Sequence, residues 1–364
     1  MTQVFRMNRQ AGHITVLVAG LLLGLSSATT MAADVSPALA ELIKAADSEK
    51  RLRLTWSDET LGGVTGVQEI QADMNKKFGT KIEFQFAPST ISMDQLGNQL
   101  TAELKAGRAS RLDAFLTSSS SAGRLASADF FHQVDWIALL PDRIRPDMVE
   151  ANGKLVRFVT YVAGVTYNSK LLPNPPKTLA GYLDPMFKGR LASTGSASAF
   201  DILGSTDFLG PEKAIEYAKS LSGQVAGLMR CSDGERLASG EFLALIFDCG
   251  GSGSARLADK GAPLAQVILQ DFVQLRYFYL GVPKHAAQPN AAKLFIAYMM
   301  TAEGQKMAWK HWFSDLHMFP ESVTAKQLAD SQIDMKVAKD IGIDWLERHP
   351  EGDAAKREIV KILR

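Results

Sequence analysis

The sequence of 364 residues has little of what marks a nucleic-acid-binding or membrane protein. Its 40 lysines and arginines nearly balance 39 aspartates and glutamates, so the formal net charge is only +1. We therefore expect no basic surface for nucleic acid or for an anionic membrane. Beyond residues 14–25, no apolar run approaches the ~20 residues that cross a bilayer.

Motifs of enzymes and cofactor sites are also missing. There is no H-E-x-x-H, and "GGSGS" at residues 250–254 departs from G-x-S-x-G at its last residue. The same stretch lacks the Lys-Ser/Thr of a phosphate-binding loop and the G-x-G-x-x-G spacing of a dinucleotide site, so no cofactor is expected. A Ser-His-Asp triad from Ser118, His285 and Asp58 keeps an exported hydrolase as the rival hypothesis.

Histidine and cysteine are scarce. Five histidines follow the first thirty residues, at 132, 285, 311, 317 and 349, without metal-ligand spacing, which argues against a zinc site. Cys231 and Cys249 are the only two cysteines. In an oxidising compartment they are a possible disulfide, and the alternative is two small buried apolar side chains.

The first residues have the pattern of an export signal. Arg6 and Arg9 precede the apolar run "ITVLVAGLLLGL", and "TTMAAD" offers small residues for cleavage. We predict a signal peptide at residues 1–32, a mature start near Ala33 or Asp34, and a soluble protein in the periplasm. The ~330 residues that follow exceed what one core usually organises, so two lobes are expected.

Alternating strand and helix patterns predict an α/β fold. Strand patterns at residues 51–56, 81–86 and 112–117 are separated by helical patterns, which is typical of a parallel sheet. The second half repeats this order. Its predicted elements are strands at 154–168, 189–194 and 242–248, a helix at 210–223, and a strand and two helices within 274–309.

Polar side chains follow several predicted strands, where ligands bind in such folds. Hydroxyls, helix N-termini and an arginine would suit an organic anion. The candidates for that role are Ser57, Ser118, Ser119, Ser120, Thr194, Ser196, Ser198 and Arg276. Trp56, Asp58, Glu59 and Asp248 would instead suit a polyamine. Candidate phenolate ligands for iron are Tyr161, Tyr277 and Tyr279. For any single serine or aspartate, the alternative is a helix cap or turn.

Two segments carry a family resemblance. They are "GVTYNSKLLPNPPKTLAGYLDPMFKGRLAST" at 164–194 and "GVPKHAAQPNAAKLFIAYMMTAEGQKMAW" at 281–309. Both resemble segments of the family 1 solute-binding proteins of ABC transporters, in the ferric, polyamine, thiamine and phosphonate cluster. The resemblance implies a type II periplasmic binding protein fold, with two α/β lobes around a ligand cleft and two hinge strands.

The resemblance also implies boundaries. Residues 33–155 and 275–320 would form lobe 1 and residues 156–274 lobe 2, with crossings near 155–165 and 270–282. Residues 321–364 would be a C-terminal helical segment of unassigned lobe.

The implied function is that of a monomeric, non-enzymatic solute-binding component of an ABC import system. It would capture a small polar solute, by our reading an organic anion, and deliver it to a permease and its ATPase. The ferric branch of the family is implied to use two adjacent tyrosines, but here that place reads Asp248-Cys249-Gly250 and no Tyr-Tyr pair occurs. Ferric iron, a polyamine, or a role in sensing stay as alternatives.

Overall fold

Residues 35–364 are described by a computed structural model, and the predicted signal peptide lies outside them. Two large clusters of buried apolar side chains divide this part of the chain, and a smaller third one lies among the strands and helices of residues 192–264. One large cluster gathers side chains mainly from residues 39–162 and 273–333, and the other mainly from residues 163–272 and 341–363. We call the regions around these cores lobe 1 and lobe 2. Within residues 35–364, no helix combines the length and apolar character that crossing a membrane requires.

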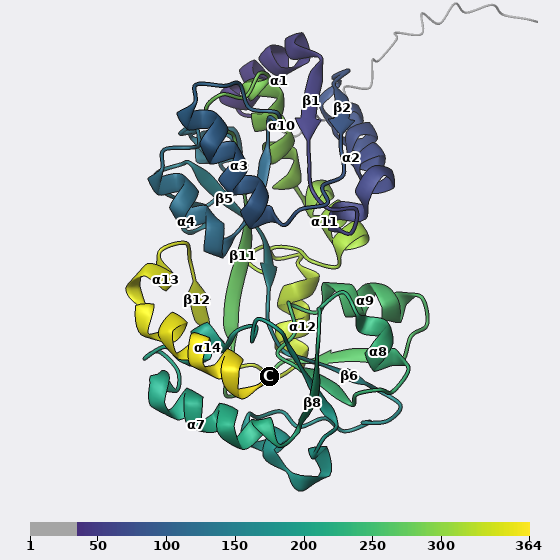
Figure 1. The fold of residues 1–364 in the computed structure, drawn as a ribbon. Coiled ribbons are helices and arrows are strands. Elements are labelled where there is room, and N and C mark those ends of the chain that lie inside the picture. Colours follow the sequence, from purple (N-terminus) through teal and green to yellow (C-terminus); the bar gives the residue numbers. More distant parts are fainter. Residues whose placement is uncertain (1–34) are drawn as a thin grey trace, which may run out of the picture. The chain divides into compact units, whose positions relative to one another are not determined.

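Lobe 1 begins with a capped helix. Ser36 caps helix α1 (Pro37–Glu49) by accepting a hydrogen bond from the backbone nitrogen of Leu39, with Pro37 in the first turn. The other elements are β1 (Arg51–Leu54), α2 (Gly63–Phe78), β2 (Glu83–Phe86), α3 (Met93–Lys105), β3 (Phe115–Ser118), α4 (Ser119–Ser127), α5 (Trp136–Leu139), β4 (Val149–Glu150), α10 (Pro289–Met299) and α11 (Ala302–Trp312). Figure 1 shows α10 beside α1 and β1.

The predicted three-stranded parallel sheet of lobe 1 is only partly present. β1 and β2 pair in parallel, but β3 pairs antiparallel with β11 (Gln274–Gly281). The backbone nitrogen of Arg53, a ladder donor in β1, donates to the Asp113 carboxylate at 2.9 Å instead of to a strand carbonyl. That side chain also binds the Arg53 guanidinium at 2.7 Å, and the Asp113 backbone nitrogen donates to the Arg53 carbonyl at 2.9 Å. Both the carboxylate and the backbone of Asp113 therefore join β1 to the segment before β3.

Lobe 2 is built on a five-stranded sheet with the order β10-β6-β9-β7-β8. Its strands are β6 (Val165–Asn168), β7 (Leu191–Thr194), β8 (Val225–Met229), β9 (Ala244–Ile246) and β10 (Leu264–Val267). Its helices are α6 (Phe200–Leu203), α7 (Gly210–Ser222), α8 (Gly234–Ala238) and α9 (Ser252–Asp259). After β6, the proline-rich turn delays helical structure until the short 3₁₀ turn Ala180–Leu183.

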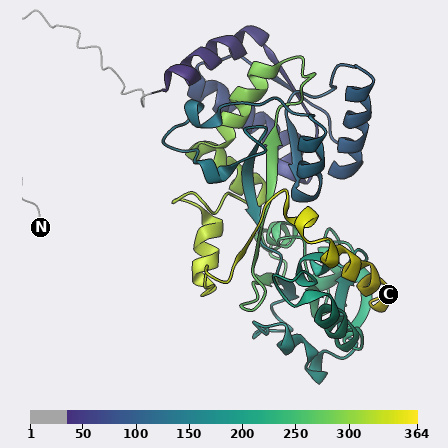
Figure 2. The same cartoon turned by 90° about the vertical axis from the view of Figure 1, so that its left-hand side faces the viewer.

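Three neighbouring strands connect the regions of the two cores. β5 (Leu155–Tyr161) pairs antiparallel with β11, and β11 pairs in parallel with β12 (Lys339–Ile341). β12 follows α12 (Val323–Asp330) and precedes α13 (Trp345–Arg348) and α14 (Pro350–Ile362). Helix α14 contacts α7 and α6 of lobe 2. It lies beside α7 in Figure 1, and Figure 2 shows the C-terminal end of the chain on the same lobe.

Candidate functional site

A glycine-rich stretch, residues 249–254, runs from the end of β9 into α9 and lines several pockets. Gly250 and Gly251 have φ values of 93° and 76°, which glycine adopts without a steric penalty. A Cβ atom on Gly250 would lie 2.7 Å from the Cβ of Tyr161, at the end of β5. The absence of a side chain at position 250 therefore lets the loop backbone lie directly against this connecting strand.

Asp248 holds that loop in place. Its buried carboxylate accepts hydrogen bonds from the backbone nitrogens of Gly164 (3.0 Å) and Gly250 (2.9 Å), from the Thr166 hydroxyl (2.7 Å) and from the Gln266 carboxamide (2.9 Å). Burial raises the pKa of this carboxyl, although these donors act in the opposite direction. The structure therefore assigns Asp248 a positioning role, which corrects the predicted contact with solute.

A disulfide ties the same loop to the segment after β8. Cys231 and Cys249 are joined, with their Cα atoms 5.9 Å apart. A pocket of about 170 Å³ lies beside the disulfide and is also lined by Glu59 of lobe 1 and Ser252 of α9. The loop is thus fixed on one side by Asp248 and on the other by a covalent bond.

One face of β11 carries an arginine and an aromatic row. The guanidinium carbon of Arg276 lies 4.9 Å from the centre of the Tyr161 ring. Phe278, two residues on and on the same face, lies 5.2 Å from Tyr161 and 4.8 Å from Trp312. The Nε atom of Arg276 is buried and has no hydrogen-bond partner in the described structure. Both Arg276 and Gly250 therefore contact the same tyrosine, one from β11 and the other from the loop.

The predicted serines of lobe 1 have different surroundings. Ser57 is half-buried, and its hydroxyl lies 2.9 Å from that of Thr60. Ser118 is half-buried at the end of β3, opposite Phe278 in the strand register. Ser119 is buried, and its hydroxyl donates to the Tyr277 carbonyl at 2.9 Å, so it has a structural role instead of the predicted one. Ser120 lies in α4, and its side chain falls outside the described part of the structure.

The predicted hydroxyls of lobe 2 lie in the loop after β7. Ser196 is exposed. Ser198 is half-buried and donates to the Asp248 carbonyl at 3.2 Å. The Thr194 hydroxyl is buried and accepts from the Ser198 backbone nitrogen at 2.7 Å, so it shapes the loop instead of facing a solute. This loop is therefore joined to the glycine-rich loop through Ser198.

Two predicted aromatic residues belong to the core. Trp56 is 2% exposed, with its ring 5.2 Å from that of Phe86. Tyr277 is 1% exposed beneath the Arg157 guanidinium, and burial raises the pKa of its phenol. β11 alternates its side chains, so Tyr277 lies on the face opposite Arg276. Neither residue has the predicted place in a polar site, whereas Asp58 is an exposed surface residue.

A pocket of about 100 Å³ has walls from both lobes. Its lining residues are Ser57, Glu59, Thr60, Ser252, Gly253, Arg256, His311, Trp312 and Phe313. Arg256 and Glu59 form an ion pair across it at 3.2 Å. Neither Arg256 nor Phe313 is among the residues predicted from the sequence to form the site. The adjacent aromatic residues Trp312 and Phe313, at the end of a predicted helix, were a signal that could have identified this wall.

The groups described above are loop backbone, hydroxyls, aromatic rings and the two arginines Arg256 and Arg276. In the described residues there is no group of three or more histidine, cysteine, aspartate or glutamate side chains placed to hold a metal ion. The arrangement is suited to binding a polar molecule beside strands that connect two lobes.

Comparison with known proteins identifies the family. Residues 69–336 match the family model described as bacterial extracellular solute-binding protein. The chain belongs to the bacterial extracellular solute-binding proteins. This membership confirms the predicted family and the predicted role as a solute-binding component of an ABC import system, and the family is one of binding proteins and not of enzymes. No curated protein is similar in sequence.

Solved structures of other solute-binding proteins share the fold. Iron-bound HitA from Pseudomonas aeruginosa is 19% identical, with a TM-score of 0.63 over 85% of this chain and 99% of HitA. The apo ferric ion-binding protein A of Pasteurella haemolytica is 14% identical, with a TM-score of 0.65 over 86% and 99%. AfuA from Actinobacillus pleuropneumoniae, with fructose-6-phosphate bound, is 19% identical, with a TM-score of 0.58 over 85% and 97%. The predicted type II periplasmic binding protein fold is confirmed.

Proposed function

We propose that this solute-binding protein captures a small organic anion, with Arg276 as the cation that receives its negative group. The observation that carries the proposal is the buried Nε–H of Arg276, which has no acceptor among the described residues. A buried donor without an acceptor costs about 1–3 kcal/mol, so a carboxylate or phosphate oxygen of a solute would regain that loss.

The glycine-rich loop adds donors of a second kind. Helix α9 begins at Ser252, and the first backbone N–H groups of a helix have no partner within it. Their dipoles favour an anionic group. Because Gly250 and Arg276 both contact Tyr161, the helix start and the guanidinium can act on one solute.

The nearby carboxylates favour an anion over a polyamine. Asp248 is saturated by donors from its own lobe, and Glu59 is paired with Arg256. Neither is free to receive an ammonium group at this place. AfuA, which shares the fold, holds a sugar phosphate, a ligand of the proposed chemical class.

Ferric iron is the alternative solute, because HitA and ferric ion-binding protein A share the fold of this chain. Phenolate ligation by Tyr161 would place the metal beside the positive charge of Arg276. Since like charges repel, this position is less suited to a ferric ion than to an anion.

We further propose the setting that the family implies: export to the periplasm, action as a monomer, and delivery to a membrane permease with its ATPase. Solute bound between the lobes would stabilise a closed arrangement that the permease distinguishes from the empty one.

The test is isothermal titration calorimetry after a thermal-shift screen of carboxylates, sugar phosphates, phosphonates, polyamines and ferric chelates. We expect an anion to raise the melting temperature. Arg276→Ala should weaken its binding by about 10–100-fold, since a hydrogen bond to a charged group contributes about 1.5–3 kcal/mol. Arg230→Ala, at an arginine whose side chain is 85% exposed, is the matched control and should bind normally. Stabilisation by polyamines or ferric chelates alone would contradict the proposal.

A further inference from the structure

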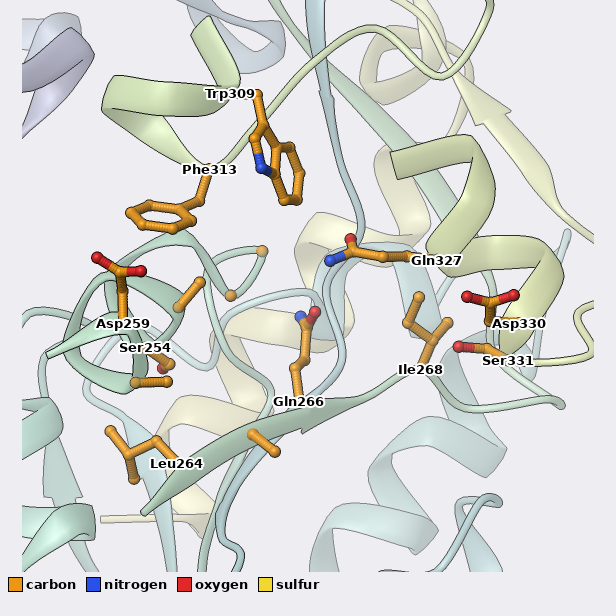
Figure 3. Close-up of a pocket in the computed structure, with 15 residues that line it drawn as sticks. Ser254, Asp259, Leu264, Gln266, Ile268, Trp309, Phe313, Gln327, Asp330 and Ser331 are labelled. Carbon is orange, nitrogen blue, oxygen red and sulfur yellow. The ribbon is translucent and has the colours of Figure 1, made fainter. Parts of the chain in front are cut away.

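Two pockets of equal size lie at different edges of the three connecting strands. The pocket in Figure 3, of about 440 Å³, is lined by Gly250 and Gly251 of the glycine-rich loop, so it is part of the site described above. The other, also of about 440 Å³, shares no lining residue with that pocket or with the two smaller ones. It lies at β12, whereas the glycine-rich loop contacts β5, and these strands flank β11 on opposite sides. We call it the β12 pocket.

Three segments that are distant in sequence enclose the β12 pocket. They are the end of α6 with the loop after it (residues 203–209), the segment before β11 (residues 270–273) and the segment that leads into β12 (residues 336–339). Pockets of about 300–1,000 Å³ are the usual size for small-molecule sites. The volume of the β12 pocket is therefore sufficient for a small ligand.

Five of the ten lining residues of the β12 pocket are apolar. These are Leu203, Phe208, Leu209, Val273 and Val337. Leu203 and Val273 are at most 1% exposed, whereas Val337 is 47% exposed. The pocket therefore combines a buried apolar floor with an apolar rim that solvent reaches, and removal of an alkyl chain from water at this place would be favourable.

The charged residues of the lining differ in their partners. Asp207 accepts a hydrogen bond from the indole nitrogen of Trp345 at 3.2 Å, and both carboxylate oxygens of Asp271 accept from a backbone N–H of lobe 2. Lys336 and Lys339 have no ion pair or side-chain hydrogen bond within residues 35–364, although Lys339 is half-buried. The ammonium groups are therefore the charges that remain available to a ligand.

We propose that the β12 pocket is a second ligand site and that it takes a medium-chain alkyl carboxylate. Lys336 and Lys339 bind the carboxylate, and the apolar floor and rim receive the chain. A single negative charge fits better than a doubly charged phosphate, because the carboxylates of Asp207 and Asp271 line the same pocket. The proposal does not rest on the solute class at Arg276, since Arg276 does not line this pocket.

The experiment is calorimetric titration of the whole protein with octanoate, below its micelle-forming concentration and at fixed ionic strength. Replacing Lys336 and Lys339 together by glutamine should weaken octanoate binding about tenfold, and each single change about two- to fivefold. Lys326→Gln is the matched control: it removes the same charge from a lysine of α12 that is paired with Asp330, and should change binding by less than about twofold. Unchanged binding in the double variant would overturn the proposal.

The apolar wall has its own test. Val337→Ser should weaken octanoate binding about threefold, because the chain loses apolar contact, whereas Val337→Ile should keep it within about twofold. Since Val337 is 47% exposed, both variants should fold, which circular dichroism checks. Equal binding by the two variants would remove the rim from the site and contradict the proposal.

Ligand analogues separate the two parts of the site. 1-Octanol, which has the chain without the charge, should bind at least about fivefold more weakly than octanoate, and acetate, which has the charge without the chain, at least about tenfold more weakly. Equal binding of octanol would reduce the pocket to an apolar hollow, and equal binding of acetate would reduce it to a charged surface; either result overturns the proposal.

Arg276→Ala distinguishes this site from the proposed solute site, because octanoate is itself an organic anion. The variant should bind octanoate as the unchanged protein does, whether or not the solute is an anion. Loss of octanoate binding in Arg276→Ala would place octanoate at the solute site and overturn the assignment to the β12 pocket.

Discussion

Asp248, at the start of the glycine-rich loop, and Arg276, in β11, are two charged residues whose polar atoms differ in their hydrogen bonding. The carboxylate of Asp248 is surrounded by donors from its own lobe. The Nε of Arg276 is buried without any acceptor in the described structure. The difference separates two functions: a charge satisfied within the protein fixes the backbone, and an unsatisfied one is available to a ligand.

The largest expected effect is the loss of Asp248. Asp248→Ala leaves several buried donors without an acceptor, so the free energy of unfolding should fall by about 3–5 kcal/mol, measured by denaturant unfolding. Arg276→Ala should change it by less than about 1 kcal/mol, because no hydrogen bond at its Nε is lost. Equal losses of stability in the two variants would remove the distinction between them.

The second effect concerns the disulfide on the same loop. Reduction of the Cys231–Cys249 bond, which closes a loop with a sequence separation of 18, should lower the free energy of unfolding by about 3 kcal/mol. Solute affinity should fall as well, because the glycine-rich loop loses one of its two anchors. Mass spectrometry of the unreduced protein checks the bond itself; two free thiols would contradict this account.

The smallest expected effect concerns Glu351, a carboxylate that accepts its hydrogen bonds near the protein surface instead of in the interior. Hydrogen bonds from its own backbone N–H, and also from Thr206 and His349, lower the pKa of Glu351 from 4.5 to about 2. A lowered pKa stabilises the folded state above pH 4.5, and this contribution is lost as the pH falls toward 2. Glu351→Gln should therefore flatten the acid side of the stability profile, measured by thermal unfolding between pH 2 and 6. An unchanged profile would show that these bonds do not act in solution.

The sequence predicted the fold well where local patterns decide it. The strands predicted at 51–56 and 81–86 and the helix predicted at 210–223 correspond to β1, β2 and α7. The pairing of β3 with β11 was not predicted, because it depends on residues more than a hundred positions apart. Asp113, whose carboxylate substitutes for a strand partner, had no local signature either.

The site was harder to predict because residue type does not determine whether a side chain is hydrogen-bonded within the protein or is available to a ligand. Ser119 and Ser198 have the same chemistry as Ser57, but the hydroxyls of both donate hydrogen bonds to backbone carbonyls. Arg276 was selected, and its burial without an acceptor became visible only in three dimensions. Phe313 was missed because its wall combines a helix end of lobe 1 with α9 of lobe 2.

The third strand between the cores has a mechanical consequence. β12 extends the pair formed by β5 and β11 into a ribbon, and the Arg157 guanidinium in β5 ties it to Asp340 at 2.7 Å. Two adjacent strands can twist about their common axis, whereas three hydrogen-bonded strands resist torsion and still bend perpendicular to their plane. We therefore expect relative motion of the lobes to be mainly a bending of this ribbon perpendicular to its plane.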